Sequence, residues 1–198
     1  MFEYLGIKIE VFDNVYNPSD DSFLMAENLL IQAGETVLEL GTGCGLISIL
    51  AALKGAHVFS VDISNLATNC TKFNSDLNNI RDRIHIITGD LLSSLKKNTE
   101  FDWILFNPPY LPADEEDTDA ILEKAWVGGQ IGNEIIFRFL DSLGDYSIKC
   151  KKIRLIFSDL SKPTEILEKI ESLSYSYEVL KVIQFFFERI YLIELTKK

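Results

Sequence analysis

The sequence predicts an α/β fold in which a mostly parallel sheet is covered by helices. An apolar run, residues 35–40, is followed at once by a glycine-rich turn and then by a helical run, residues 46–53, which Gly55 closes. A second apolar strand, residues 57–61, ends in Asp62. A strand, a glycine turn, a helix, a strand and an acid together make one half of a Rossmann-type fold.

The glycine turn is the first candidate binding element. Its glycines, Gly41, Gly43 and Gly45, allow a tight turn and leave room for a ligand beside the start of the next helix. The spacing differs from the Gly-x-Gly-x-x-Gly pattern of dinucleotide sites. The carboxylate of Asp62 could accept from both hydroxyls of a ribose, which favours a nucleoside ligand. The alternative is a turn that only connects a strand to a helix, with Asp62 as an ordinary turn residue.

Two further acids follow the same pattern. Strand 84–88 is followed by Asp90 and Leu91, and ligands of open α/β sheets bind at the carboxyl ends of the strands. Asp90 could accept from an exocyclic adenine amine with Leu91 against the ring, or it could cap a following helix. Glu39, on the first strand, could accept from a ligand ammonium group. Taken together, these acids are best explained by one amine-bearing nucleoside.

The chemical signal comes from the tetrapeptide Asn-Pro-Pro-Tyr, residues 107–110, directly after the apolar run 103–106. Each proline fixes φ near about −65°, so the corner is rigid. The Asn107 side-chain oxygen and the Pro108 carbonyl can both accept from one NH₂ group, and Tyr110 offers an aromatic face to the same planar target. This arrangement suits a conjugated, non-basic nitrogen as the reacting atom. Taken alone, the tetrapeptide fits an Asn-initiated surface turn equally well.

These motifs together resemble those of class I S-adenosylmethionine-dependent methyltransferases that act on amide or amine nitrogens. Residues 15–24, with the pattern Tyr-x-Pro-x-x-Asp-Ser, are similar to the corresponding segment of archaeal and eukaryotic HemK-like release-factor glutamine methyltransferases. Residues 125–129, followed by Gly132, also resemble that family. The resemblance extends from residue 10 or so to about residue 140.

The resemblance implies a class I methyltransferase domain with a seven-stranded, mostly parallel sheet in the order 3-2-1-4-5-7-6 and helices on both faces. It implies S-adenosyl-L-methionine as cofactor and the Gln amide of the Gly-Gly-Gln motif in a class 1 release factor as acceptor. The expected catalytic residues are Asn107, Pro108 and Tyr110. The expected cofactor-binding residues are Ser22, Glu39, Gly41, Gly43, Gly45, Asp62, Asp90, Leu91 and Asn107.

Three alternatives stay open at this point: an N6-adenine nucleic-acid methyltransferase, a protein-lysine methyltransferase and a binding subunit without activity. The net charge of −11 and the acidic run at residues 114–119 would repel a phosphate backbone, so a nucleic-acid partner is not expected. An acidic rim suits a basic protein surface, although a charge run is often only a solvated loop. The intact Asn107 and the acids argue against a binding subunit without activity.

Length and composition predict one domain, residues 1–198, with an N-terminal leading segment of residues 1–33. The sequence has no apolar run of about 18 residues and no signal-peptide pattern. Its three cysteines form no Cys-x-x-Cys pair, so neither a disulfide framework nor a zinc site is expected. We expect a cytoplasmic protein without a membrane partner.

The remaining segments predict scaffold. In the first helix, Asp20 and Asp21 fall in the first turn, where acids favour the positive helix end. The last two strands are expected to form a hairpin around Gln184 and Phe185. Helices are expected at residues 18–32, 64–77, 131–143 and 164–173, and strands at 152–157, 177–183 and 186–195.

One strand predicts a partner. In the implied strand order, Ile84–Ile87 lies at a sheet edge, and this run carries no charge. Native edges are normally blunted by charge, proline or a cover, so pairing with a strand of another protein would satisfy it. The resembled subfamily uses a small zinc-binding activator protein, which is the candidate. The alternative is that the charged residues at 81–83 shield the edge sufficiently.

Overall fold

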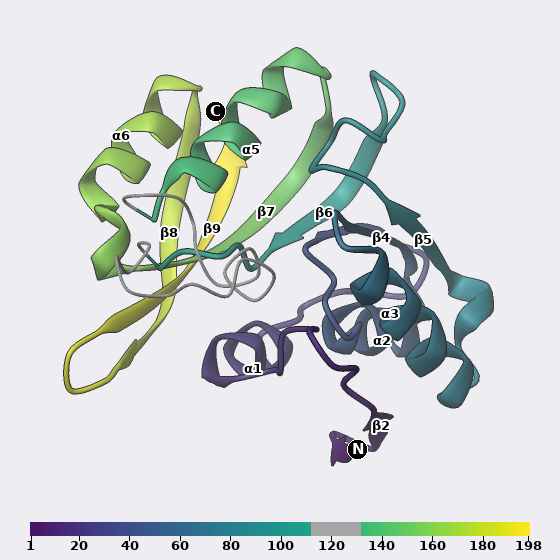
Figure 1. The fold of residues 1–198 in the computed structure, drawn as a ribbon. Coiled ribbons are helices and arrows are strands. Elements are labelled where there is room, and N and C mark those ends of the chain that lie inside the picture. Colours follow the sequence, from purple (N-terminus) through teal and green to yellow (C-terminus); the bar gives the residue numbers. More distant parts are fainter. Residues whose placement is uncertain (112–131) are drawn as a thin grey trace.

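The computed structural model describes residues 1–111 and 132–198. The strands of its main sheet are β3 (Thr36–Leu40), β4 (His57–Asp62), β5 (Ile84–Thr88), β6 (Glu100–Phe106), β7 (Lys149–Ser158), β8 (Tyr175–Gln184) and β9 (Arg189–Lys197). They form one seven-stranded sheet in the order β5-β4-β3-β6-β7-β9-β8. The first five are parallel, and β9 runs antiparallel to both of its neighbours (Figure 1). Numbered from β3, this order is 3-2-1-4-5-7-6, which confirms the predicted class I methyltransferase topology.

Helices cover both faces of the sheet. The described helices are α1 (Asp20–Glu27), α2 (Leu46–Leu53), α3 (Asn65–Leu77), α5 (Glu134–Asp145) and α6 (Pro163–Ser172), with short 3₁₀ turns at Arg81–Arg83 and Asp159–Ser161. Figure 1 shows α1, α2 and α3 on one face and α5 and α6 on the other. A small antiparallel hairpin, β1 (Phe2–Tyr4) with β2 (Ile7–Ile9), precedes them. Among the described residues, no helix is both long and apolar enough to cross a membrane.

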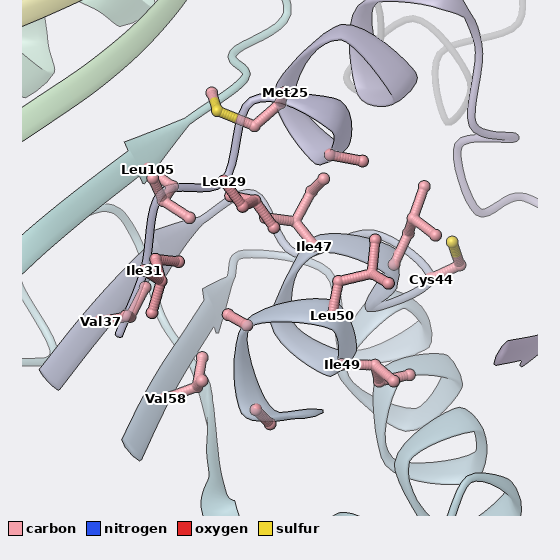
Figure 2. Packing of buried hydrophobic residues seen from close by; sticks show 14 of the residues in the cluster. Met25, Leu29, Ile31, Val37, Cys44, Ile47, Ile49, Leu50, Val58 and Leu105 are labelled. Atoms are coloured by element: carbon pink, nitrogen blue, oxygen red, sulfur yellow. The ribbon is translucent and has the colours of Figure 1, made fainter. Parts of the chain in front are cut away.

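The sheet is buried on both faces because alternate strand residues enter two separate cores. Val37 belongs to the core beneath α1 and α2, whereas Leu38 belongs to the core beneath α5 and α6. Figure 2 shows the first core, where Met25 of α1 and Ile47 of α2 lie with Leu105 of β6 among the packed residues. In the second core the rings of Phe106 and Phe139 make an edge contact, with centroids 5.0 Å apart. The apolar strand runs in the sequence therefore reflect burial from both sides.

Most predicted elements have the expected type, and the differences lie at their ends. The first helix was predicted to reach residue 32 but ends at Glu27. Leu29 and Ile31 beyond it are nevertheless buried, so their apolar pattern is satisfied without helix. The last strand was predicted from residue 186 but begins at Arg189, because the Phe185 amide donates to the Glu188 carbonyl at 2.7 Å and closes a turn.

The hairpin of β1 and β2 was not predicted, since strands of three residues are too short to show a period. The acidic run 114–119 and the segment 125–129 lie outside the described residues. The acidic rim predicted from the first segment and the local similarity of the second therefore stay predictions.

Candidate active site

A cavity of about 880 Å³ opens at the carboxyl ends of the parallel strands β3, β4, β5 and β6. This volume is in the range of small-molecule and cofactor sites. Its wall combines the glycine turn, the leading segment around α1 and the Asn-Pro-Pro-Tyr corner. It is completed by Ile135 and Arg138 of α5 and by Phe185, Glu188 and Ile190 of the β8–β9 hairpin. The structure thus brings the predicted site segments to one place.

The glycine turn needs glycine for two different reasons. Gly43 has φ +55°, and its amide donates to Asp62 Oδ2 at 3.0 Å. Gly45 has φ +85°, and a Cβ there would lie 2.9 Å from the Thr71 methyl group. Gly45 does not line the cavity, unlike the other residues predicted to bind the cofactor. Its position indicates a packing role, in which it lets α2 begin close against α3.

Asp62 serves the turn and faces the cavity at once. Its second oxygen, Oδ1, accepts from the Ser64 amide at 2.8 Å, which starts α3. Burial raises the pKa of Asp62, and the hydrogen bonds from the two amides oppose that shift. Each carboxylate oxygen can accept two hydrogen bonds. Asp62 therefore does act as a turn residue, which was the alternative that the sequence left open. Its carboxylate can still accept further hydrogen bonds from a ligand in the cavity.

Glu39 is a deeply buried acid of the cavity wall, with 5% of its surface exposed. The hydroxyl of Ser48 donates to Glu39 Oε2, and the hydroxyl of Thr42 does so at 3.2 Å. Burial raises the pKa of Glu39 to about 8, against the hydroxyl contacts that lower it. A cationic group in the cavity would favour the ionised carboxylate.

Asp90 and Leu91 reach the cavity from the end of β5. Leu91 has φ +48°, and residues 91–95 form turns rather than the helix that Asp90 was considered to cap. The Asp90 carboxylate pairs with the guanidinium of Arg138 at 2.6 Å. Both side chains are substantially exposed, so the pair adds little stability. Its effect is to connect the end of β5 to α5.

The Asn-Pro-Pro-Tyr corner is held by Asp21, an acid of α1 that lies 86 residues before Asn107 in the sequence. Asn107 Nδ2 donates to Asp21 Oδ2 at 3.0 Å, and the Tyr110 hydroxyl donates to the same oxygen at 3.2 Å. The Tyr16 hydroxyl lies 2.8 Å from Asp21 Oδ1, and Ser22 contacts that oxygen through its amide and its hydroxyl. Asp21 itself is 4% exposed. Four side chains from two segments therefore converge on one carboxylate.

This contact decides which way the Asn107 amide points. Because the NH₂ group faces Asp21, Asn107 Oδ1 is left buried and has no hydrogen-bond partner among the described residues. A buried polar atom without a partner is costly, and it marks a place where a ligand donor would bind. Burial and the nearby Asp21 carboxylate raise the pKa of Tyr110, which therefore stays protonated and donates.

The nucleoside side and the corner side of the cavity adjoin. Leu40 pairs with Phe106 across β3 and β6, so the glycine turn and the corner leave the sheet side by side. A Cβ on Gly41 would lie 3.6 Å from the Asn107 carbonyl oxygen. One end of a ligand bound beside the glycine turn would thus lie next to an acceptor group bound at Asn107.

Asp21, Tyr16 and Arg138 are among the cavity residues that the sequence analysis did not assign to the site. Asp21 was assigned only to the positive end of its helix, where it does lie. The one signal for it was the Tyr-x-Pro-x-x-Asp-Ser pattern, which contains Tyr16, Asp21 and Ser22. Nothing in the sequence pointed to Arg138, because its partner is 48 residues away.

The sheet order, the nucleoside-sized cavity and the acceptor corner together define a class I methyltransferase. The family model described as methyltransferase small domain matches residues 17–126. A Methanocaldococcus jannaschii protein named as an N5-glutamine methyltransferase is 37% identical over 195 residues, which cover 98% of this chain and 97% of that protein. The chain therefore belongs to the methyltransferase small domain family, in its HemK-like branch of protein N5-glutamine methyltransferases.

Two further relatives agree with this assignment. Human methyltransferase HEMK2 is 32% identical over 169 residues, which cover 79% of this chain and 78% of that protein. The solved E. cuniculi Mtq2-Trm112 complex matches with a TM-score of 0.69 and 26% identity, over 93% of this chain and 99% of that chain. The cofactor of this enzyme is S-adenosyl-L-methionine. The cavity fits it, because the carboxylates of Glu39, Asp62 and Asp90 and an apolar wall suit a cationic, amine-bearing nucleoside.

Proposed function

We propose that this enzyme methylates the side-chain amide nitrogen of the Gln in the Gly-Gly-Gln motif of a class 1 release factor. The observation that carries the proposal is the buried Asn107 Oδ1 at the cavity wall, which has no partner among the described residues. The names of the relatives support it: one is named as an N5-glutamine methyltransferase, and the E. cuniculi complex is responsible for methylating the termination factor eRF1.

The corner supplies what an amide acceptor needs. The lone pair of an amide nitrogen is delocalised into the carbonyl, so this nitrogen is a poor nucleophile. In our proposal Asn107 Oδ1 and the Pro108 carbonyl accept the two N–H groups and aim the nitrogen at the reacting carbon, with the Tyr110 ring against the amide plane. Positioning of this kind can contribute several orders of magnitude in rate. The same two acceptors draw on the amide protons, one of which leaves during or after transfer.

The cofactor supplies an electrophilic methyl group on its sulfonium. For its binding we propose that Asp62 accepts from the ribose hydroxyls and that Asp90 accepts from the adenine amine, with Leu91 beside the ring. Glu39 and Ser22 would face the amino-acid end. The support for these roles is that all of these residues line one cavity next to the glycine turn.

Mass spectrometry with labelled cofactor tests the acceptor. The enzyme is incubated in parallel with a release factor, with the same factor carrying Ala in place of the motif Gln, with a histone-like peptide and with DNA. We expect one methyl group on the motif Gln and none on the Gln-to-Ala factor. The Asn107→Ala enzyme serves as the inactive control. Labelling of lysine or adenine in preference to the release factor would overturn the proposal.

We also propose that the edge strand β5 pairs with a small zinc-binding activator subunit. β5 ends the sheet, with Ile84 buried and Ile86 and Ile87 half-buried. The Arg81 guanidinium donates to the Ile84 carbonyl. This contact supports the alternative that the charged residues at 81–83 shield that end of the strand. The relative in the E. cuniculi complex is bound to Trm112. A release factor as acceptor would place the reaction in the cytoplasm.

Co-expression with the activator tests the partner. We expect the isolated chain to be poorly soluble or weakly active, and both properties to improve with the activator present. An isolated chain that is monodisperse, fully active and unchanged by the activator would show that the edge needs no partner.

A further inference from the structure

Asp21 is a buried acid that the methyl-transfer chemistry above does not use. Its side chain joins α1 to the Asn-Pro-Pro-Tyr corner, 86 residues further along the chain. It accepts from the Asn107 amide, the Tyr110 hydroxyl and the Tyr16 hydroxyl at 2.8–3.2 Å. An ionised carboxylate can only accept hydrogen bonds. Unlike the amide of an Asn side chain, the carboxylate of Asp21 therefore requires each hydrogen-bonding neighbour to present a donor.

This restriction has a specific consequence for Asn107. A primary amide can rotate by half a turn and exchange its oxygen for its NH₂ group. With the Asp21 carboxylate behind it, only one of the two orientations makes a hydrogen bond. The other would set a carbonyl oxygen against a carboxylate oxygen and leave the NH₂ group facing the cavity. An NH₂ group there would meet the NH₂ group of the acceptor, donor against donor.

We propose that Asp21 is the positioning residue of methyl transfer: it fixes the orientation of the Asn107 amide and thereby makes the site specific for acceptors that present an NH₂ group. This inference rests on the proposed function of Asn107. Asp21 acts through Asn107 and does not touch the acceptor. Its carboxylate accepts from the NH₂ end of the Asn107 amide, which polarises the amide so that Oδ1 becomes a stronger acceptor.

The two tyrosines complete the arrangement. Tyr110 and Tyr16 each have a single hydroxyl proton, and both hydroxyls lie within hydrogen-bond distance of Asp21. Burial and the Asp21 carboxylate raise the pKa of both phenols, so neither serves as a base. Their donors stabilise the charge of Asp21, which is otherwise costly to bury. Removing one tyrosine hydroxyl should therefore cost stability while leaving the Asn107 orientation set.

A double-mutant cycle on the full chain separates positioning from mere packing. Asp21→Asn, Asn107→Ala and the double variant are compared for kcat, for KM toward the release factor, for cofactor affinity and for Tm. Asp21→Asn should lower kcat by about 10²-fold, the loss typical of one misplaced polar contact, with little change in cofactor affinity. In the Asn107→Ala background the same change should have almost no further effect, because its target is absent.

Two variants serve as controls. Tyr16→Phe removes one donor to Asp21 but keeps the contact of Asp21 with Asn107, so it should lower Tm and should lower kcat far less than Asp21→Asn does. Asp13→Asn removes one exposed acidic charge from the same segment and should change neither kcat nor Tm. A kcat of Asp21→Asn near that of the wild type, or losses that add fully in the double variant, would overturn the inference. Equal kcat losses in Asp21→Asn and Tyr16→Phe would do so too.

Failure of the proposed function gives a different result. If the wild-type enzyme methylates another NH₂-bearing acceptor, the release factor assignment fails, and the same cycle on that acceptor still decides the role of Asp21. If Asp21→Asn loses cofactor affinity and Tm together with kcat, Asp21 is a packing residue and the inference is wrong.

Discussion

The nucleoside side and the acceptor side of the cavity hold their acids by different means. Asp62 is held by the backbone amides of Gly43 and Ser64, which are 19 and 2 residues away in the sequence. Asp21 is held mainly by side chains, and two of its partners, Asn107 and Tyr110, are 86 and 89 residues away. The first arrangement follows from a local turn, whereas the second exists only when distant segments have met.

This difference teaches where substitutions should act. A backbone amide remains when a side chain is replaced, so the nucleoside side tolerates changes at most positions and depends on glycines and on the acid itself. On the acceptor side most contacts of Asp21 come from side chains, so a single substitution there can remove one of them. Four substitutions test this contrast.

Asn107→Ala should break the acceptor side alone. Because Asn107 Oδ1 is the buried acceptor without a partner among the described residues, its loss should lower kcat by about 10²-fold or more. Cofactor affinity should hardly change, since the glycine turn and Asp62 are intact. Steady-state kinetics and calorimetry on the same preparation check this. Turnover near the wild-type rate would remove the central claim for the corner.

Asp62→Ala should break the nucleoside side alone. We expect cofactor binding to weaken by roughly 1.5–3 kcal/mol, the range for hydrogen bonds to a charged group. Once the cofactor is saturating, kcat should stay close to that of the wild type. Titration calorimetry measures the affinity, with S-adenosyl-L-homocysteine as a stable ligand. Unchanged affinity, or tighter binding of a nicotinamide nucleotide, would contradict the assignment.

Gly45→Ala sharpens the comparison by changing the turn without touching an acid. The alanine would have to adopt a positive φ, and its methyl group would lie 2.9 Å from the methyl group of Thr71. Strain and overpacking together should lower the free energy of unfolding by roughly 1–3 kcal/mol. Gly34→Ala is the matched control, because φ there is +86° with nothing within 4 Å. Urea unfolding should show a clearly larger loss of unfolding free energy for Gly45→Ala than for Gly34→Ala. Equal losses would mean that the contact with Thr71 does not contribute to the destabilisation.

Glu39→Gln should give the smallest effect, seen as a dependence on pH. Burial raises the pKa of Glu39 from its ordinary 4.5 to about 8. As pH rises through this window, the unfolded chain loses its proton before the folded one, so the stability of the apo enzyme should fall. The Gln variant cannot titrate, so its stability relative to the wild type should grow between pH 5 and pH 8, approximately. Parallel pH curves for the two proteins would show that Glu39 does not titrate in this range.

The contrast between the two sides also explains what the sequence could predict. The run from Thr36 to Asp62 was predicted almost to the residue, because each of its signals is local: an apolar run, glycines, a helical period and a terminal acid. The strand order followed from the family resemblance and is confirmed. Of the predicted cofactor-binding residues, Gly45 alone does not line the cavity, since spacing cannot separate a ligand glycine from a packing glycine.

The acceptor side could be predicted only in part. Asn107 and Tyr110 were identified from the rigid corner, but Asp21 was not, since a first-turn acid has an ordinary explanation in the helix dipole. The length of α1 was wrong for a related reason: Leu29 and Ile31 are buried as a helical period requires, although the chain there is not helical. Long-range partners and the ends of elements depend on packing that a local pattern does not contain.

The long separation between Asp21 and Asn107 has a consequence for biosynthesis. The ribosome delivers Asp21 first, and 85 or so further residues must follow before its amide partner leaves the exit tunnel. A domain generally folds as a unit, so the contact between Asp21 and Asn107 can form only after β6 and the corner have emerged. Until then α1 has no corner to close against, although the glycine turn and Asp62 have already been synthesised.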